Sequence, residues 1–506
     1  MTSADAAGGR RLGGAGLGLV GGSVACFLVT ALLGPSAMQP ALPGKSGQPP
    51  YSLTVHPSPY LVIGLVAAGI LAGVAGLGLC MPAVRRGWRP RPFPLLIAGL
   101  LVTAAFSFMP PIGSGDHLNY AAYGRMAVTG HDPYVTRSVD VPGDPVIGAV
   151  EEWRTTPSVY GPIATAQEAF ASWIGGESMR LTVFVLSVTN ALAFVITALV
   201  LYRSAGGEPG RLRGVLLWTC NPLLLFHLVA GAHNDVLAIA PMVASVALFS
   251  AAKRAGLWRT LATGALVGAG VAIKLPAALV GGGPAWVLPR RAFSERDRRA
   301  WWGLVALFGG AGLVALIAFT AAGSHAFDQV RNASNMVSFA TPWHLVDTLL
   351  GRGGQRTIIK IGWLALMVVL VVLLARALPG ERDEPAGQSR RIAAALVIAW
   401  LFAAPYELPW YDGFGWAVIA LLPWSRFDAI LLAHTGALSL AYLPARDPKL
   451  IRLPDGLSWL FTAVRPVVIP LALTGVLVAL ILACRRPERP APAPGRSPRA
   501  PAGSRG

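Results

Sequence analysis

The sequence predicts an all-α protein that crosses a membrane many times. Of its 506 residues, 54% are hydrophobic and only 13% are charged, and the mean hydropathy is +0.57. Apolar runs of membrane length recur along the chain, and ~20 apolar residues in a helix span the hydrocarbon core. Because lipid offers no hydrogen-bond partners, each spanning segment must satisfy its own backbone, which favours helices. The composition excludes an ordinary soluble domain.

Helices placed on the apolar runs give about 14 spans, within a range of roughly 12 to 14. In order, they fall near 14–34, 60–81, 94–109, 180–202, 214–230, 236–252, 260–273, 275–288, 301–321, 358–375, 392–404, 413–424, 428–443 and 464–484. The pairs at 260–288 and 392–424 are short, which suits tilted, half-length or re-entrant segments. The sequence thus predicts a short cytoplasmic N-terminus (1–13), a membrane module (14–484) and a Pro/Arg-rich disordered cytoplasmic tail (485–506).

The basic residues predict the orientation of these spans. With a cytoplasmic N-terminus, 28 of the 42 Lys and Arg residues fall in inside segments, as the positive-inside rule requires. The net charge of +18 is therefore interpreted as a mark of topology, and no nucleic-acid partner is expected. The four cysteines lie in spans or at a cytoplasmic end, so they indicate neither disulfides nor a metal site.

The largest predicted outer segment, 110–179, begins with GSGDHLNYAAYGRMAVTGHDPY. Asp116, Tyr120 and Tyr123 fall at i, i+4 and i+7, so a helix places them on one face. Ser114 or Asp116 is the expected helix cap, and TGHDPY is expected to end the helix. The stretch is either a capped interfacial helix with tyrosine anchors or a catalytic acid held at the membrane surface.

Three other stretches place polar side chains at predicted outer ends. GAHND joins His233, Asn234 and Asp235, which either cap the next helix or contact a ligand. Lys274 lies in an apolar stretch, where a lysine must snorkel, pair or bind an anion. We expect an anion, with Arg331 as a second cation. PYELPWYDGFG carries aromatics and acids, which suit either sugar binding or an aromatic belt.

These motifs resemble the GT-C glycosyltransferases, which use lipid-phosphate sugars outside the cytoplasm. More narrowly, SGDHLNYAAYGRMAVTGHDPY, SVYGPI, NPLLLFHLVAGAHND and VAIKLPA resemble actinobacterial polyprenol-phosphate-mannose-dependent α-1,6-mannosyltransferases, over about residues 100 to 290. The resemblance implies a GT-C-like fold with juxtamembrane helices in the plasma membrane. It also implies inverting transfer of mannose from polyprenyl phosphate mannose to a growing α-1,6-mannan of lipomannan type at the outer face.

The resemblance implies roles for individual residues. Asp116 is the expected catalytic base, which deprotonates the acceptor hydroxyl. Lys274 and Arg331 are expected to hold the donor phosphate, which leaves without a second carboxylic acid. The expected substrate-binding residues are His117, Tyr120, Arg125, Asp132, Tyr160, His233, Asn234, Asp235, Glu407 and Trp410. No cofactor is expected.

Several alternatives stay open. Asp116, His117, His131 and Asp132 could ligate a divalent cation, but their spacing matches no zinc or EF-hand signature, so no metal is expected. A transporter or flippase of a lipid-linked sugar also uses intramembrane charges, although the chain shows no internal repeat. A noncatalytic scaffold is a further possibility. Within the enzyme class, the donor could be another polyprenyl-phosphate sugar, such as arabinose or glucose.

Overall fold

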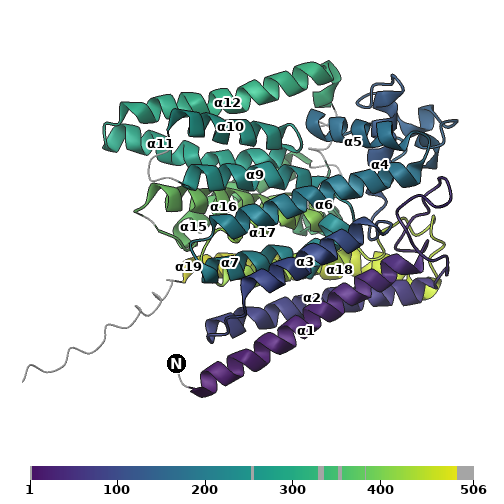
Figure 1. Cartoon of the computed structure of the whole chain (residues 1–506), viewed down its shortest axis with the longest axis horizontal. Helices are drawn as coiled ribbons and strands as arrows, with labels where there is room; N and C mark the ends of the chain where they lie inside the picture. Colours follow the sequence, from purple (N-terminus) through teal and green to yellow (C-terminus); the bar gives the residue numbers. More distant parts are fainter. Residues whose placement is uncertain (1–2, 252–255, 329–335, 352–355, 382, 487–506) are drawn as a thin grey trace, which may run out of the picture.

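The protein folds as a bundle of helices. The computed structural model describes residues 3–251, 256–328, 336–351, 356–381 and 383–486. Within these ranges every regular element is a helix, and one isolated bridge joins Ser36 and Gln39. Most helices run along the longest axis of the molecule (Figure 1). The all-α prediction is therefore confirmed, while Arg331 and most of the predicted tail lie outside the described residues.

Seven helical segments of the described chain are long and apolar enough to cross a membrane. They are Ala7–Leu33, Pro59–Arg85, Met179–Ser204, Glu208–Ala230, Arg298–Ala322, Arg356–Ala377 and Asp455–Arg485. Three shorter apolar helices are Pro92–Ser107, Asp235–Ser250 and Phe427–Ala441. These segments agree with a multi-pass membrane protein, whereas the count of about 14 spans stays a prediction.

The first half of the chain pairs long helices around one group of short ones. The N-terminal helices are α1 (Ser3–Leu33), α2 (Pro59–Arg85) and α3 (Pro92–Ser107). The 110–179 segment holds α4 (Asp116–Val128), η1 (Ser138–Asp140), η2 (Ile147–Ala149) and α5 (Pro162–Gly175). Next come α6 (Met179–Ser204), α7 (Glu208–Gly214), η3 (Val215–Thr219), α8 (Pro222–Leu224), η4 (Leu225–Ala230) and α9 (Asp235–Ser250).

The second half completes the bundle. Its first elements are α10 (Leu257–Val271), η5 (Leu275–Gly281), α11 (Gly282–Ser294), α12 (Arg298–Ala322) and η6 (Ser324–Phe327). The others are α14 (Pro342–Leu349), α15 (Arg356–Ala377), α16 (Pro385–Ala403), η7 (Pro409–Tyr411), α17 (Asp412–Ile419), α18 (Phe427–Ala441), η8 (Asp455–Leu457), η9 (Leu460–Val468) and α19 (Ile469–Arg485).

Prolines interrupt three of the predicted spans. The 214–230 run is divided at Pro222, where Asn221 caps a new helix. The 275–288 run starts as the 3₁₀ helix η5, with Pro276 in its first turn, and becomes α-helical only in α11. Helix α17 ends at Ile419, shortly before Pro423. Proline lacks a backbone N–H and crowds the preceding turn, so a continuous α-helix fails at these places.

Glycines allow α10 and α12 to pack at close range. A Cβ atom on Gly264 would lie 2.0 Å from the carbonyl oxygen of Leu307, and one on Gly310 would lie 2.2 Å from that of Leu261. Small residues of this kind bring helix backbones together in membranes. Only 11% of the apolar window of α12 is buried, against 100% for Glu208–Ala230. Helix α12 therefore presents most of its surface outward.

The two ends of the bundle differ. Helices α4 and α5 and the loops beside them gather at one end, while the N-terminus, α7 and the turn between α11 and α12 lie at the other (Figure 1). The arginines of α7 and of the α11–α12 turn therefore lie far from α4. The orientation of these two ends in the membrane stays a prediction.

Candidate active site

Asp116 is the first residue of α4. Its backbone N–H donates to Oγ of Ser114 at 3.0 Å, and the residue in the N-cap position is Gly115. The prediction of Ser114 or Asp116 as the cap is therefore wrong by one position. Glycine suits this position because a Cβ atom there would lie 3.2 Å from Oε2 of Glu152. The end of the helix at Val128 is as predicted.

Asp116 lines a cavity of about 150 Å³, called the Asp116 cavity below. The walls come from α4, the loop before α5, the residue before η5 and the segment around η7, which are distant in sequence. They comprise Asp116, Asn119, Tyr123, Trp153, Thr156, Val159, Tyr160, Lys274, Met336, Tyr406, Leu408, Trp410, Tyr411 and Tyr442. The structure therefore brings four predicted site residues together: Asp116, Tyr160, Lys274 and Trp410.

His233 lies behind Asp116 and does not line the cavity. Its Nε2 atom is 3.7 Å from Oδ2 of Asp116, and its Nδ1 atom is 2.6 Å from the carbonyl oxygen of His227. A carbonyl only accepts, so Nδ1 carries a proton, and Nε2 of the neutral ring is an acceptor. The imidazole stacks on Trp410, with 3.6 Å between ring centroids, which fixes its plane.

Lys274 forms an ion pair at the cavity wall. Its Nζ atom is 2.5 Å from Oδ1 of Asp235, whose side chain is fully buried. The ammonium also lies 4.2 Å from the ring centroid of Tyr411 and 5.9 Å from that of Tyr160. An ammonium has three N–H donors, so pairing with Asp235 leaves donors for a ligand in the cavity.

The side chain of Asn234 contacts α5 and not the partners of His233 and Asp235. Its Nδ2 atom donates to Oε1 of Glu168 at 3.3 Å, and Glu168 is a fully buried residue of α5. The three contiguous residues of the GAHND motif thus contact three different partners. These contacts connect the start of α9 with α4 through His233, with α5 through Asn234, and with Lys274 through Asp235.

The electrostatics of the cavity favour a base at Asp116. Burial, reinforced by the carboxylate of Glu152, raises the pKa of Asp116 to about 7, although Lys274 opposes the rise. A carboxylate with this pKa accepts a proton far more readily than an exposed one. A general base is most effective when its pKa is near the working pH.

Comparison with known proteins identifies the family. Residues 17–290, more than half of the chain, match the family described as alpha-(1->6)-mannopyranosyltransferase, N-terminal domain. The chain belongs to this family. The resemblance found in the sequence motifs is therefore confirmed.

Relatives of known name match parts of the chain. Alpha-(1->6)-mannopyranosyltransferase A of Corynebacterium glutamicum is 28% identical over 34% of this chain and 34% of its own length. The A enzyme of Mycobacterium tuberculosis is 26% identical over 62% of this chain and 63% of its own length. The chain thus matches less than two thirds of either relative. The crystal structure of ArnT from Cupriavidus metallidurans bound to undecaprenyl phosphate has a TM-score of 0.42 and 13% identity, over 78% of this chain and 76% of that one.

The four predicted substrate-binding residues on α4 or just after it lie outside the walls of the Asp116 cavity, as His233, Asn234, Asp235 and Glu407 also do. His117 is fully buried, and Tyr120 is buried with its hydroxyl 3.5 Å from that of Tyr160. Arg125 forms an ion pair with Asp144 at 2.8 Å. Asp132 is exposed and accepts the backbone N–H of Tyr134 at 2.9 Å. Helix α4 presents only one side to the cavity, so the side chains of His117, Tyr120 and Arg125 do not line it, and Asp132 follows the end of the helix. Substrate contacts by these four residues stay predictions.

Other functional candidates were missed by sequence reasoning, or, like Tyr406, belonged to a predicted sugar-binding stretch without being assigned a role. Glu152, Tyr406 and Tyr442 face the site from loops or helix ends, and Glu168 supports it from α5. Tyr406 stands in the aromatic stretch PYELPWYDGFG, which was a usable signal. Glu168 is the one acid of a largely apolar helix, which was another. Glu152 and Tyr442 carry no pattern that marks them, because only the fold brings them to Asp116.

Proposed function

We propose that this protein transfers mannose from polyprenyl phosphate mannose to a growing α-1,6-mannan, with inversion, at the outer face of the plasma membrane. One observation carries the proposal: Asp116 and Lys274 come from distant parts of the sequence and line one cavity. A base and a cation on one small cavity suit a substrate that carries both a hydroxyl and a phosphate.

The proposed reaction has one displacement step. The acceptor hydroxyl gives its proton to Asp116 as its oxygen forms a bond with the anomeric carbon of the donor. The bond between that carbon and the phosphate oxygen breaks, and its electron pair leaves with the phosphate. Inversion yields an α-linkage from a β-linked donor. The transition state resembles an oxocarbenium ion, as in glycoside hydrolysis.

Lys274 is the proposed partner of the departing phosphate. Its N–H donors beyond the one used by Asp235 can contact the phosphate oxygens on which charge develops. The ion pair with Asp235 holds the ammonium in place before the substrate arrives. This preorganisation supports the role expected for Lys274, whereas the matching role of Arg331 rests on sequence alone.

The outer location and the lipid-linked donor are supported by topology. Helix α4 lies at the end of the bundle opposite the arginine-rich turns (Figure 1), and arginine-rich turns face the cytoplasm in most membrane proteins. A sugar tethered to a membrane lipid can reach a base that stands directly beside the spans. The names of the relatives support mannose as the sugar.

The test is transfer by membranes that contain the wild-type protein, compared with membranes that lack it. Radiolabelled polyprenyl phosphate mannose and a short α-1,6-mannoside are supplied, and linkage analysis identifies the product. We expect an acceptor extended by one α-1,6-linked mannose. Transfer from an arabinose or glucose lipid but not from the mannose lipid would contradict the proposed donor. Translocation of the lipid-linked sugar without transfer would favour the flippase alternative.

A further inference from the structure

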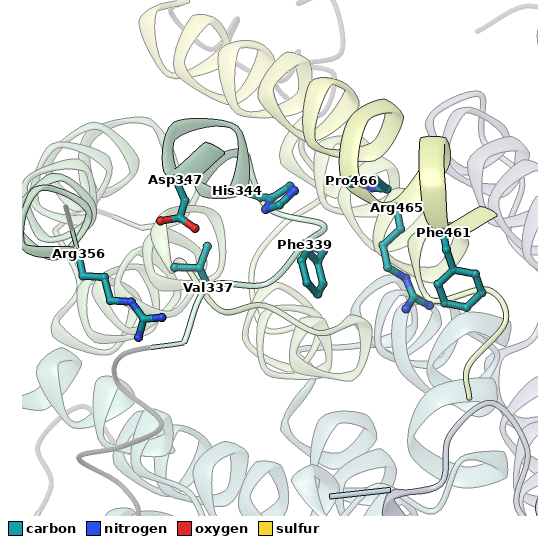
Figure 2. A pocket seen from close by; sticks show the side chains of 8 residues that line it. All are labelled: Val337, Phe339, His344, Asp347, Arg356, Phe461, Arg465 and Pro466. Atoms are coloured by element: carbon teal, nitrogen blue, oxygen red, sulfur yellow. The ribbon is translucent and has the colours of Figure 1, made fainter. Parts of the chain in front are cut away.

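A larger groove adjoins the Asp116 cavity. This Glu407 groove has a volume of about 800 Å³ and shares the wall residues Trp153, Thr156, Met336, Tyr406, Leu408 and Tyr442 with the Asp116 cavity. It continues into a cavity of about 410 Å³ between α14, α15 and η9. Figure 2 shows this far cavity, with Phe461 and Arg465 on η9 facing Phe339. The Asp116 cavity, the Glu407 groove and this far cavity therefore adjoin one another in that order, leading away from Asp116.

The walls of the Glu407 groove combine charges with aromatic rings. Arg154 and Asp447, which are both exposed, contribute charged groups, and Trp153 and Phe461 contribute rings. A hydrocarbon chain in this groove would remove Arg154 and Asp447 from water without compensation, which is unfavourable. Sugar hydroxyls both donate and accept hydrogen bonds, and sugar faces pack on rings. The wall chemistry therefore suits a glycan and disfavours a polyprenyl tail.

Glu407 contributes a buried carboxyl group to the wall of the groove. Its side chain is 2% exposed, and neither carboxyl oxygen has a hydrogen-bond partner among the described residues. Burial, with Asp412 nearby, raises the pKa of Glu407 well above its usual range. A neutral carboxyl group donates one hydrogen bond and accepts others, so it matches a sugar hydroxyl.

Trp153 stands where the groove meets the Asp116 cavity. Its backbone has φ of +58°, a left-handed conformation that bulky L-residues rarely adopt and that clusters at functional sites. Its side chain is 47% exposed, although it lines both spaces. A ring at this junction suits a platform for the sugar next to the reacting one.

We propose that the Glu407 groove is the acceptor-binding site, which holds a neutral α-1,6-linked mannan chain whose terminal sugar reaches Asp116. This inference rests on the proposed function. Trp153 contacts the sugar nearest to the reaction, Glu407 binds a hydroxyl along the chain, and Phe461 contacts sugars farther from the reacting end.

The test compares a short acceptor, a disaccharide, with a long one, a hexasaccharide, in steady-state transfer assays. Trp153→Ala is expected to raise KM for both acceptors about tenfold. Glu407→Leu, which removes both the donor and the acceptor at a similar side-chain volume, is expected to raise acceptor KM about fivefold, the scale of one lost hydrogen bond. Phe461→Ala is expected to raise KM only for the long acceptor. KM for the lipid donor stays unchanged in all three.

Matched controls lie at the opposite end of the bundle. Phe293→Ala removes an exposed ring and Arg211→Gln an exposed charge, and both are expected to match the wild type. Equal KM changes for short and long acceptors in Phe461→Ala, or a raised donor KM in any groove variant, would overturn the inference. Wild-type transfer with groove variants unchanged for both acceptors would also overturn it. Failure of the wild type to transfer mannose would instead contradict the proposed function.

Discussion

The Nε2 atom of His233 lies 3.7 Å from Oδ2 of Asp116 and has no hydrogen-bond partner among the described residues. Because Nδ1 already donates to the carbonyl of His227, Nε2 of the neutral ring presents a lone pair to the carboxylate. Two acceptors facing each other favour a proton between them. Asp116 is therefore a stronger base with His233 behind it, because the protonated carboxyl group can donate to Nε2.

His233→Gln is expected to weaken the base without removing it. The amide of glutamine can donate to the Asp116 carboxylate, which stabilises the ionised form and lowers its pKa. The acid limb of the pH profile of kcat/KM should then move to lower pH by about one unit, and the plateau rate should fall about tenfold. His434→Gln is the control, because that buried histidine contacts Asp412 at 2.9 Å and does not line the cavity. An unshifted limb in His233→Gln would contradict the pairing.

The charges around Asp116 predict opposite shifts for two variants. A base must be deprotonated to act, so kcat/KM should fall as the pH drops below about 7, the pKa of Asp116. Glu152→Gln removes a negative charge that raises this pKa, so the limb should move to lower pH by about half a unit to one unit. Lys274→Met removes a positive charge that lowers it, so the limb should move to higher pH.

Other ionisable groups near Asp116 also influence the acid limb of the pH profile of kcat/KM. Besides Glu152 and Lys274, the ionisable groups that interact electrostatically with Asp116 are Tyr120, Tyr123, Tyr160, Asp235, Tyr406 and Tyr442. Asp140→Asn is a suitable control, because Asp140 is an exposed acid of the same segment, paired with Arg137. Shifts of the same sign in Glu152→Gln and Lys274→Met would show that the limb does not report Asp116.

A buried ion pair is expected to determine stability at the end of the bundle far from Asp116. Arg213 and Asp428, 3% and 1% exposed, make two hydrogen bonds at 2.6 and 3.0 Å. Arg213→Met leaves Asp428 buried without its partner, which should cost about 3–5 kcal/mol of folding free energy. Thermal unfolding in detergent should show a lower midpoint. The double variant Arg213→Met/Asp428→Leu should recover most of the loss, and a midpoint as low as that of the single variant would contradict this account.

The contact between α10 and α12 predicts a steric effect. Gly264→Leu would force a side chain against the Leu307 carbonyl oxygen, which lies 2.0 Å from the position of a Cβ atom, and the helices would have to separate. We expect a marked loss of thermal stability and of folded protein. Gly309→Leu is the matched control, because a Cβ atom there has no neighbour within 4 Å. Equal stability of the two variants would contradict the close approach.

The sequence predicted the local features of the site and much less of its assembly. Periodicity and breakers located α4 and its end at Val128. The isolated Lys274 was predicted to snorkel, pair or bind an anion, with an anion favoured; the structure shows a pair with Asp235, and anion binding stays a prediction. The partner itself, Asp235, was predicted only as a substrate-binding residue. Nothing in one sequence states which outer loops meet, so the convergence of Tyr406, Tyr442 and Glu152 on Asp116 required the fold.

The prediction of the membrane spans from the sequence was limited in a similar way. Long uninterrupted apolar runs such as α2 and α6 were placed within a few residues. Runs that contain proline, such as 275–288, were predicted as single helices although η5 and α11 differ in helix type. Hydropathy records only whether a segment prefers lipid, whereas the proline decides whether its backbone can continue as one α-helix.

The central claim is that Asp116 is the base for mannosyl transfer, and one comparison tests it most directly. Wild-type protein and Asp116→Asn are brought to matched expression in membranes, and transfer from radiolabelled polyprenyl phosphate mannose is measured near pH 8, where Asp116 is ionised. Asparagine keeps the shape of the side chain but cannot accept the proton, so we expect a loss of at least about a hundredfold. Transfer by Asp116→Asn at a rate close to that of the wild type would contradict the claim.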